Sequence, residues 1–357
     1  MKLSVLTLCC DKDWECMDML LNNIATVYKE TNKSFDDYEV ILVDNRITYV
    51  NEPTNWHKYS NVTVLLANDT TMYKCRRQAF YKATGDYIWV VDGDDLIIKI
   101  PEVVDDTDIV GFKYYIGTSD VSTAIDTIIS KEDMLLQDGL SYKYTTFNKH
   151  GFLSQAYTYI LCSKVMLWCK IFKSDLLKQV YTILPSDLDI NATEDLLVWT
   201  LALAFAKSIS YYDTACYFYN CSRSLNHNST FTLSSYSRMI KGVDESLNLL
   251  HSFVQQGVIQ CSSKWINIVA RNHCYIFAGK LLLVQDPDER LEAIKLLLNI
   301  FDARTIETSI LRYYIDTGIS DRRTILLTLL ELDRLLCEGA PMEPSLSKLI
   351  KELDYGN

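Results

Sequence analysis

The sequence is poor in the residues that interrupt regular structure. Only 6 of its 357 residues are prolines and 12 are glycines, which favours helices and strands joined by short loops over long flexible linkers. There is no internal repeat and no low-complexity tract. Since 48% of the residues are hydrophobic, the chain can build one large domain or two smaller ones, each with its own core.

Long hydrophobic runs are also missing. Leu196–Ala206 is the longest and falls well short of the roughly 20 residues that a membrane-spanning helix needs. The apolar amino terminus lacks the length and the small-residue cleavage site of a secretory signal, so we interpret it as a first strand. We therefore expect a cytoplasmic protein without a membrane span.

The cysteines form no metal or disulfide pattern. No CxxC pair and no Cys/His ladder occurs among the 11 of them. This odd, scattered set favours reduced and mostly buried thiols. Cys9 and Cys10 are adjacent, but a disulfide between neighbours is strained, so we expect them to end a strand.

Basic charge is in deficit. The chain has 35 Lys and Arg against 46 Asp and Glu, a formal net charge of -11. The whole surface therefore cannot form a phosphate-binding field, and a nucleic-acid partner would need a local basic patch.

Apolar runs of strand character alternate with helical periodicity in the first hundred residues. The expected strands are 3–8, 38–43, 62–66 and 87–91, and the expected helices are 18–28 and 73–83, the second of which we expect Gly85 to terminate. This order predicts an α/β layer with a mostly parallel sheet. In such sheets ligands bind beyond the carboxyl ends of the strands.

The pattern is less clear for residues 119–155, where we expect a helix over Lys131–Gln137. From about Tyr236 onward it is almost purely helical, with expected helices at 268–283, 288–301, 306–315 and 322–336. This part is interpreted as a helical bundle. Its default role is core packing, and an oligomer contact or an acceptor-docking surface are alternatives.

Acidic side chains follow two of the expected strands, which we take to be neighbours. Asp44 ends the second run, and Asp92, Gly93, Asp94 and Asp95 follow the fourth. A small residue between two carboxylates lets both converge on one cation, and oxygen-rich sites suit Mg²⁺ or Mn²⁺. An isolated Asp-x-Asp is more often a solvated turn. Its position after a buried strand favours a metal and nucleotide site, where the ion neutralises a departing diphosphate.

With these motifs, the stretch from Leu3 to Asp95 resembles the nucleotide-sugar-binding half of the family 2 glycosyltransferases of the GT-A fold. The matching segments stand in the family's order and are spread over about two thirds of the chain: LSVLTLCCD, YEVILVDN, CRRQAFYKATGDYIWVVDGDD, LWCKIFKSDLL and ATEDLLVWTLALAFAKSISYYDTACYFYN. The resemblance implies a GT-A type, Rossmann-like α/β fold with a mostly parallel sheet flanked by helices. It also implies a GT-A domain over 1–232, with a donor half at 1–118 and an acceptor-side half at 119–232, followed by a C-terminal helical domain at 233–357.

The resemblance implies donor-binding residues at the strand ends and on the second helix. They are Thr7, Leu8, Cys9, Asp44, Arg76, Asp92 and Gly93. Asp44 would bind the nucleobase or its ribose. Arg76 would lie close to the nucleotide, at the position of the arginine in an Ala-Arg-Asn signature whose Asn is here Arg77.

The resemblance also implies metal-binding and catalytic residues. Asp94 would be the principal ligand of Mn²⁺ or Mg²⁺, and Asp92 would hold ribose or metal-bound water. His227 stands where some relatives carry a third ligand, although a lone loop histidine is more often a surface residue. Glu194 and Asp195 match a Thr-Glu-Asp motif whose aspartate is the general base on the acceptor hydroxyl. Their alternative role is to complement the dipole of an apolar helix as its first-turn acids.

The sequence departs from the family at several points. The usual Pro-x-Tyr-Asn after the first strand is replaced by residues 8–11, and the Gln-x-x-Arg-Trp motif of processive synthases is absent. We therefore expect a metal-dependent, non-processive and inverting glycosyltransferase with a nucleotide diphosphate donor, most simply a UDP-sugar. The acceptor hydroxyl is open among a glycan, a protein, a small molecule and a hydroxylated DNA base. A nucleotidyltransferase and a non-catalytic GT-A-like binding scaffold are the alternatives.

Overall fold

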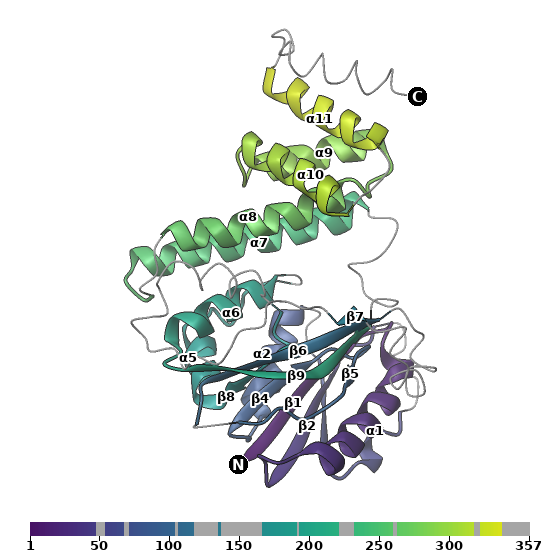
Figure 1. Cartoon of the computed structure of the whole chain (residues 1–357), viewed down its shortest axis with the longest axis vertical. Coiled ribbons are helices and arrows are strands. Elements are labelled where there is room, and N and C mark those ends of the chain that lie inside the picture. The colour runs from purple at the N-terminus through teal and green to yellow at the C-terminus, as the bar shows by residue number, and fades with distance from the viewer. Residues whose placement is uncertain are drawn as a thin grey trace. The chain divides into compact units, whose positions relative to one another are not determined.

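The computed structural model describes residues 1–47, 54–67, 71–103, 106–117, 135–136, 166–190, 193–220, 232–259, 263–317 and 322–337. The chain divides into two compact units, residues 1–227 with 256–261 and residues 228–255 with 262–357 (Figure 1). We predicted that the helical domain begins at residue 233, and the second unit begins at residue 228.

A mixed sheet organises the first unit. Its strands are β1 (Lys2–Cys9), β2 (Asp37–Asp44), β3 (Val62–Leu66), β4 (Tyr87–Val91), β5 (Leu96–Ile97), β6 (Ile109–Gly117), β7 (Leu135–Leu136), β8 (Lys170–Lys173) and β9 (Ile209–Asn220). The strand order is β3-β2-β1-β4-β8-β6-β9-β5, with β7 beside β6. Strands β1 to β4 pair in parallel, as do β6 and β9, whereas β5, β7 and β8 pair antiparallel. The predicted mostly parallel sheet is confirmed.

The helices of this unit are α1 (Trp14–Thr31), α2 (Met72–Lys82), α5 (Ser174–Ile183) and α6 (Glu194–Phe205), with a short 3₁₀ turn, η1 (Trp56–Lys58). Side chains alternate along a strand, so β1 places Leu3, Val5 and Cys9 in one buried cluster with the apolar face of α1. The connections from β1 to β2 and from β3 to β4 run in opposite directions across the sheet. Right-handed crossovers therefore place α1 and α2 on opposite faces.

The strand order indicates where a sheet of this kind binds ligands. Strand β1 has β2 and β3 on one side and β4 on the other, and in α/β sheets ligands bind at such a reversal, beyond the carboxyl ends. We expected the two acid-bearing strands β2 and β4 to be neighbours. This expectation is wrong, because β1 lies between them. Their carboxyl ends still meet the same edge of the sheet.

The second unit contains α7 (Leu233–Gln255), α8 (Ser263–Leu281), α9 (Pro287–Leu298), α10 (Ala303–Thr317) and α11 (Arg322–Cys337). Helix α9 shows why the start of a helix can be predicted from the sequence. The Asp286 side chain accepts hydrogen bonds from the backbone N–H groups of Asp288 and Glu289, at 2.9 and 3.0 Å, and Pro287 occupies the first turn, where its missing N–H costs nothing.

Two local expectations are wrong. In the segment predicted as a helix over Lys131–Gln137, the described residues Leu135 and Leu136 form strand β7 and pair with β6. Gly85 does not terminate α2, which ends at Lys82 before an extended residue. Instead, the backbone N–H of Gly85 donates to Ser4 Oγ at 2.8 Å.

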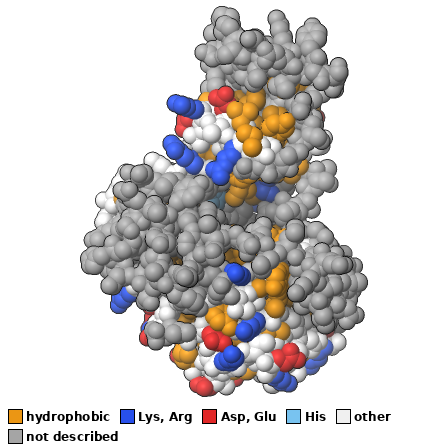
Figure 2. All heavy atoms as spheres, in the orientation of Figure 1, with side chains coloured by type: hydrophobic (Ala, Val, Ile, Leu, Met, Phe, Trp, Pro, Cys, Tyr) orange, Lys and Arg blue, Asp and Glu red, His pale blue; other side chains and the backbone are white. Residues whose placement is uncertain are grey.

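The expectations about membrane spans, surface charge and cysteines can be compared with the structure. None of the described helices has the length and apolar character to cross a membrane. Figure 2 shows one face of the molecule, on which the coloured basic and acidic side chains are interspersed. Seven cysteines are described with their side chains, and all are free thiols; Cys10 is half-buried, and the others are buried: Cys9, Cys16, Cys75, Cys169, Cys216 and Cys274.

The close approach at Gly85 gives a first prediction. A Cβ at this position would lie 2.6 Å from Ser4 Oγ and 2.7 Å from Ser4 N. We expect Gly85→Ala to lower the free energy of unfolding by about 1–3 kcal/mol, measured by urea unfolding with tryptophan fluorescence, since every tryptophan except Trp265 lies in the first unit. The exposed control Lys82→Ala should stay within about 0.5 kcal/mol of wild type. Equal stability of Gly85→Ala and wild type would contradict the close approach.

Candidate active site

The acidic turn after β4 is held against the end of β1. The fully buried strand β4 ends at Val91, and the backbone N–H of Asp95 donates to the carbonyl of Asp92 at 3.2 Å to close the turn. A Cβ on Gly93 would lie only 2.5 Å from the carbonyl oxygen of Leu8. Glycine is therefore required sterically if both carboxylates of the Asp-x-Asp motif are to lie beside β1.

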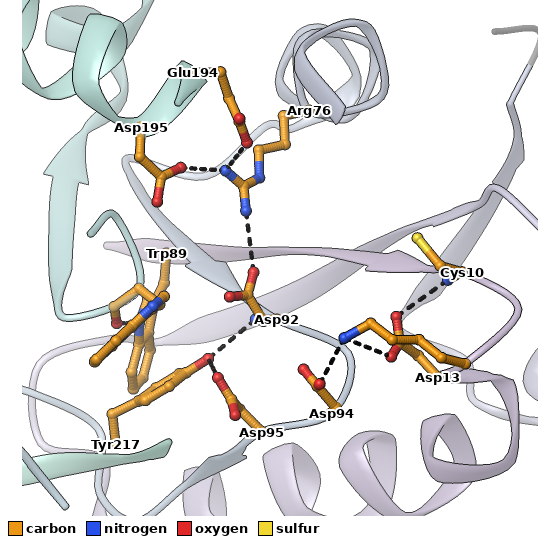
Figure 3. Close-up of polar contacts among 12 residues, drawn as sticks. Cys10, Asp13, Arg76, Trp89, Asp92, Asp94, Asp95, Glu194, Asp195 and Tyr217 are labelled. Carbon is orange, nitrogen blue, oxygen red and sulfur yellow. Dashed lines mark hydrogen bonds and ion pairs between the residues drawn. The ribbon is translucent and has the colours of Figure 1, made fainter. Parts of the chain in front are cut away.

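Arg76, on α2, joins this turn to the start of α6 (Figure 3). Its Nη2 donates to Asp92 Oδ1 at 3.0 Å, and its Nη1 donates to Glu194 Oε1 and Asp195 Oδ1. The guanidinium is buried. The structure thus brings the Asp-x-Asp motif and the two acids of the Thr-Glu-Asp motif onto one basic group. Arg76 remains a predicted nucleotide neighbour, with a structural role that the sequence did not reveal.

Thr193 adopts a strained backbone beside these acids. Its φ is 72°, the left-handed region that is unfavourable for a β-branched residue. Its carbonyl accepts the hydrogen bond from Leu196 N at 3.0 Å, so it starts α6. Strain of this kind persists where the surroundings fix it, and here Arg76 holds the two residues that follow. The turn aims both Glu194 and Asp195 at one point.

The two acids of α6 differ in access to solvent. The side chain of Glu194 is 4% exposed and that of Asp195 is 24% exposed. Burial raises the pKa of Glu194 to about 7, against the attraction of Arg76, and the nearby Asp195 carboxylate adds to the rise. Asp195 is therefore the more accessible of the two carboxylates, whereas Glu194 is buried against Arg76.

Tyr217, on β9, forms hydrogen bonds with the acidic turn. Its hydroxyl donates to Asp95 Oδ2 at 2.7 Å and accepts from the backbone N–H of Asp92 at 3.0 Å. The backbone N–H of Asn220 donates to Asp95 Oδ1 at 2.7 Å. Burial, followed by the charges of Asp92 and Asp94, holds the pKa of Asp95 well above its usual range. Asp95 thus ties the turn to β9 through its hydrogen bonds. We did not identify its partners Tyr217 and Asn220 from the sequence.

Lys12, in the loop after β1, was also missed. Its Nζ lies 2.7 Å from Asp94 Oδ2 and 3.4 Å from Asp13 Oδ1. The backbone N–H of Cys10 donates to the other oxygen of Asp13, at 3.3 Å, and burial raises the pKa of Asp13 to about 6. The signal available in the sequence was a lysine between two aspartates directly after a strand.

The residues present fit a divalent ion that shares its coordination with a ligand. Asp92 and Asp94 offer carboxylate oxygens, and Mg²⁺ commonly takes one or two carboxylates together with phosphate oxygens and water. In the described part of the chain, no group of three His, Cys, Asp or Glu side chains is arranged to hold a metal. His227, the predicted third ligand, lies outside the described residues.

The residues predicted to bind the nucleobase lie at the ends of β1 and β2, on the side of β1 away from β4. Cys9 pairs in register with Asp44. The Asp44 carboxylate forms a bidentate ion pair with Arg46, with Nε to Oδ1 and Nη2 to Oδ2 both at 2.8 Å, and the Arg46 guanidinium lies over the ring of Trp56. Asp44 remains a predicted donor-binding residue, and its charge is already balanced.

The structure also describes the predicted donor-binding residue Thr7, and Arg77, which follows Arg76 on α2. Thr7 is buried near the end of β1, and its Oγ1 has no hydrogen-bond partner among the residues that the structure describes. Arg77, at the position of the family's Asn, donates to the carbonyl of Tyr181 at 2.6 Å and so ties α2 to α5.

The link through Arg76 predicts a large loss of stability on its removal. Arg76→Met would leave buried carboxylates without their cation, which costs about 3–5 kcal/mol. We expect urea unfolding followed by tryptophan fluorescence to show this loss, and the exposed control Arg238→Met to stay within about 0.5 kcal/mol of wild type. An unfolding free energy for Arg76→Met as high as that of the control would rule out the proposed link.

The raised pKa of Glu194 predicts a pH dependence of stability. Between its ordinary value of 4.5 and about 7, the folded protein holds a proton that the unfolded chain releases, so the favourable contribution of this proton is lost as pH rises. Because Glu194→Gln is always neutral, we expect its stability relative to wild type to improve from pH 5 to pH 8. Urea unfolding at both pH values measures this change, with the exposed Glu292→Gln as control. If the difference in unfolding free energy between Glu194→Gln and wild type is the same at pH 5 and pH 8, the raised pKa of Glu194 is refuted.

Comparison with solved structures finds S. aureus TarS. A structure of TarS residues 1–349 matches with a TM-score of 0.54 and 17% identity, covering 95% of this chain and 92% of that chain. Structures of the same TarS segment in complex with UDP and with UDP-GlcNAc match with TM-scores of 0.55 and 0.54, at 17% and 18% identity and the same coverage. In a longer TarS structure, at 15% identity and a TM-score of 0.53, the match covers 55% of that chain.

The sequence matches no protein-family model and none of the curated proteins with which it was compared. At this identity the likeness to TarS shows the fold. The predicted GT-A type α/β fold is therefore confirmed, and this chain shares it with S. aureus TarS.

Proposed function

We propose that the chain is a glycosyltransferase that moves one sugar from a UDP-sugar to an acceptor hydroxyl. The observation that carries the proposal is the bridge formed by Arg76, which joins Asp92 of the Asp-x-Asp turn to Asp195 of the Thr-Glu-Asp motif. A donor-binding group and a candidate base therefore share one site. The TarS complexes with UDP and UDP-GlcNAc, on the same fold, support a UDP-linked donor and make UDP-GlcNAc the first one to test.

The site divides naturally into a donor side and an acceptor side. Asp92 and Asp94 follow β4 and would hold Mn²⁺ or Mg²⁺, an ion that supplies positive charge to the diphosphate as it departs. Asp195 begins α6, on the other side of the Arg76 guanidinium. An inverting displacement needs its base on the face opposite the leaving group, and this separation supports that outcome.

The acceptor is proposed only by class, as a hydroxyl on a glycan, a protein, a small molecule or a hydroxylated DNA base. The formal net charge of -11 disfavours nonspecific binding along nucleic acid. The absence of a Gln-x-x-Arg-Trp motif supports transfer of a single sugar.

Asp195 gives the test of this function. Asp195→Asn keeps the shape of the side chain but cannot accept the proton, so we expect UDP release from UDP-GlcNAc with an acceptor to fall about 10²- to 10⁴-fold. The affinity for UDP, measured by calorimetry, should change little. The control Asp189→Asn, at an exposed position before α6, should retain full turnover.

The product identifies the reaction class. A glycosyltransferase releases UDP, a nucleotidyltransferase releases pyrophosphate, and a binding scaffold releases neither. Full turnover by Asp195→Asn would show that Asp195 is not the base. If no UDP-sugar binds to the protein, the proposed donor class is refuted.

A further inference from the structure

Lys12 lies across the point where the strand order reverses. It follows β1 by three residues in the sequence, and its ammonium contacts Asp94, which belongs to the turn after β4. The same ammonium contacts its neighbour Asp13 at 3.4 Å. Lys12 therefore connects the two strand ends between which the diphosphate of a nucleotide would lie in this fold.

The carboxylates around Lys12 need a cation. Asp13 and Asp94 are both buried, and a buried carboxylate without a positive partner is costly. The turn that carries Asp94 also packs closely against the chain around β1, because a Cβ on Gly93 would lie 2.5 Å from the Leu8 carbonyl and 3.1 Å from Asp13 Cβ. Lys12 supplies positive charge beside Asp94, as a divalent ion held there would.

Of the two basic groups that contact the Asp-x-Asp turn among the described residues, Lys12 is the one able to move. The Arg76 side chain is 4% exposed and fixed by three carboxylates. The Lys12 side chain is 38% exposed, and a lysine carries a compact charge on a flexible four-carbon stem. Lys12 can therefore release Asp94 without disturbing the bridge between β4 and α6.

We propose that Lys12 is the protein's own cation at the Asp-x-Asp motif: it occupies Asp94 in the empty site, yields Asp94 to the divalent ion, and then pairs with the diphosphate of the donor. This inference rests on the proposed function and adds a residue outside the family motifs. It makes Lys12 a competitor of the metal when no nucleotide is present and a ligand of the nucleotide when no metal is present.

The first test measures Mn²⁺ binding to the protein alone, from the electron paramagnetic resonance signal of free Mn²⁺. The apolar variant Lys12→Met no longer competes for Asp94. Since a partly exposed ion pair contributes about 1 kcal/mol, we expect Lys12→Met to bind Mn²⁺ about fivefold more tightly than wild type. Lys58→Met, which removes an exposed lysine paired with Asp18, should leave Mn²⁺ affinity unchanged.

The second test measures UDP affinity in EDTA by calorimetry. Without metal, the ammonium of Lys12 is the mobile charge for the diphosphate, so Lys12→Met should weaken UDP binding about tenfold or more. Lys12→Arg retains the charge and should recover most of this affinity, and Lys58→Met should match wild type.

The opposite directions of the two effects separate the possible outcomes. A merely structural role of Lys12 would weaken both Mn²⁺ and UDP binding in Lys12→Met, and that result overturns the inference. Equal Mn²⁺ affinity in Lys12→Met and wild type overturns it as well. If wild type binds no UDP with or without Mn²⁺, the proposed function itself fails, whatever the first test shows.

Discussion

The ion-pair contacts of the Arg76 guanidinium are the interaction on which the candidate site depends. Three carboxylates from two distant parts of the sequence converge on this one group. Buried ion pairs add little net stability compared with apolar packing, because both partners lose their hydration, but they fix geometry strictly, since an unpaired buried charge is costly. The strained Thr193 backbone is consistent with this constraint. Arg76 thereby sets the position of Asp195 relative to Asp92, which no local motif could do.

The rest of the site is shaped by a surplus of acid. Six carboxylates lie near the ends of β1 and β4 and the start of α6. Arg76 and Lys12 pair with five of them, Asp13, Asp92, Asp94, Glu194 and Asp195, and the sixth, Asp95, accepts a hydrogen bond from Tyr217. Protons relieve part of the repulsion, because burial raises the pKa values of Glu194 and Asp95. A divalent ion and the mobile Lys12 together would meet the remaining demand for positive charge, and the diphosphate of a donor would then bind to that charge.

Sequence periodicity located strands β1 to β4, helices α1 and α2 and helices α8 to α11, because buried strands and amphipathic helices repeat at periods that few other structures share. It did not predict strands β5 to β9, and it placed a helix over the segment that contains β7. The motif order located Asp92, Asp94, Glu194 and Asp195. Long-range pairing was not readable, since nothing in the sequence near Arg76 indicates that two of its partners, Glu194 and Asp195, lie 118 and 119 residues away. Gly85 was misjudged because a close approach and a helix stop require the same residue type, and the period of the Leu135 segment was ambiguous in so short a run.

The central claim is that the Asp-x-Asp turn, which would hold the donor, and Asp195, which would act on the acceptor, form one site at the carboxyl ends of β1 and β4. A crystal structure with UDP bound in the presence of Mn²⁺ tests it most directly. The account predicts the diphosphate beside Asp94 and Lys12, with Arg76 still bridging Asp92 and Asp195. Density for UDP at another edge of the sheet, or an Arg76 that leaves Asp195 to bind the nucleotide, would contradict it.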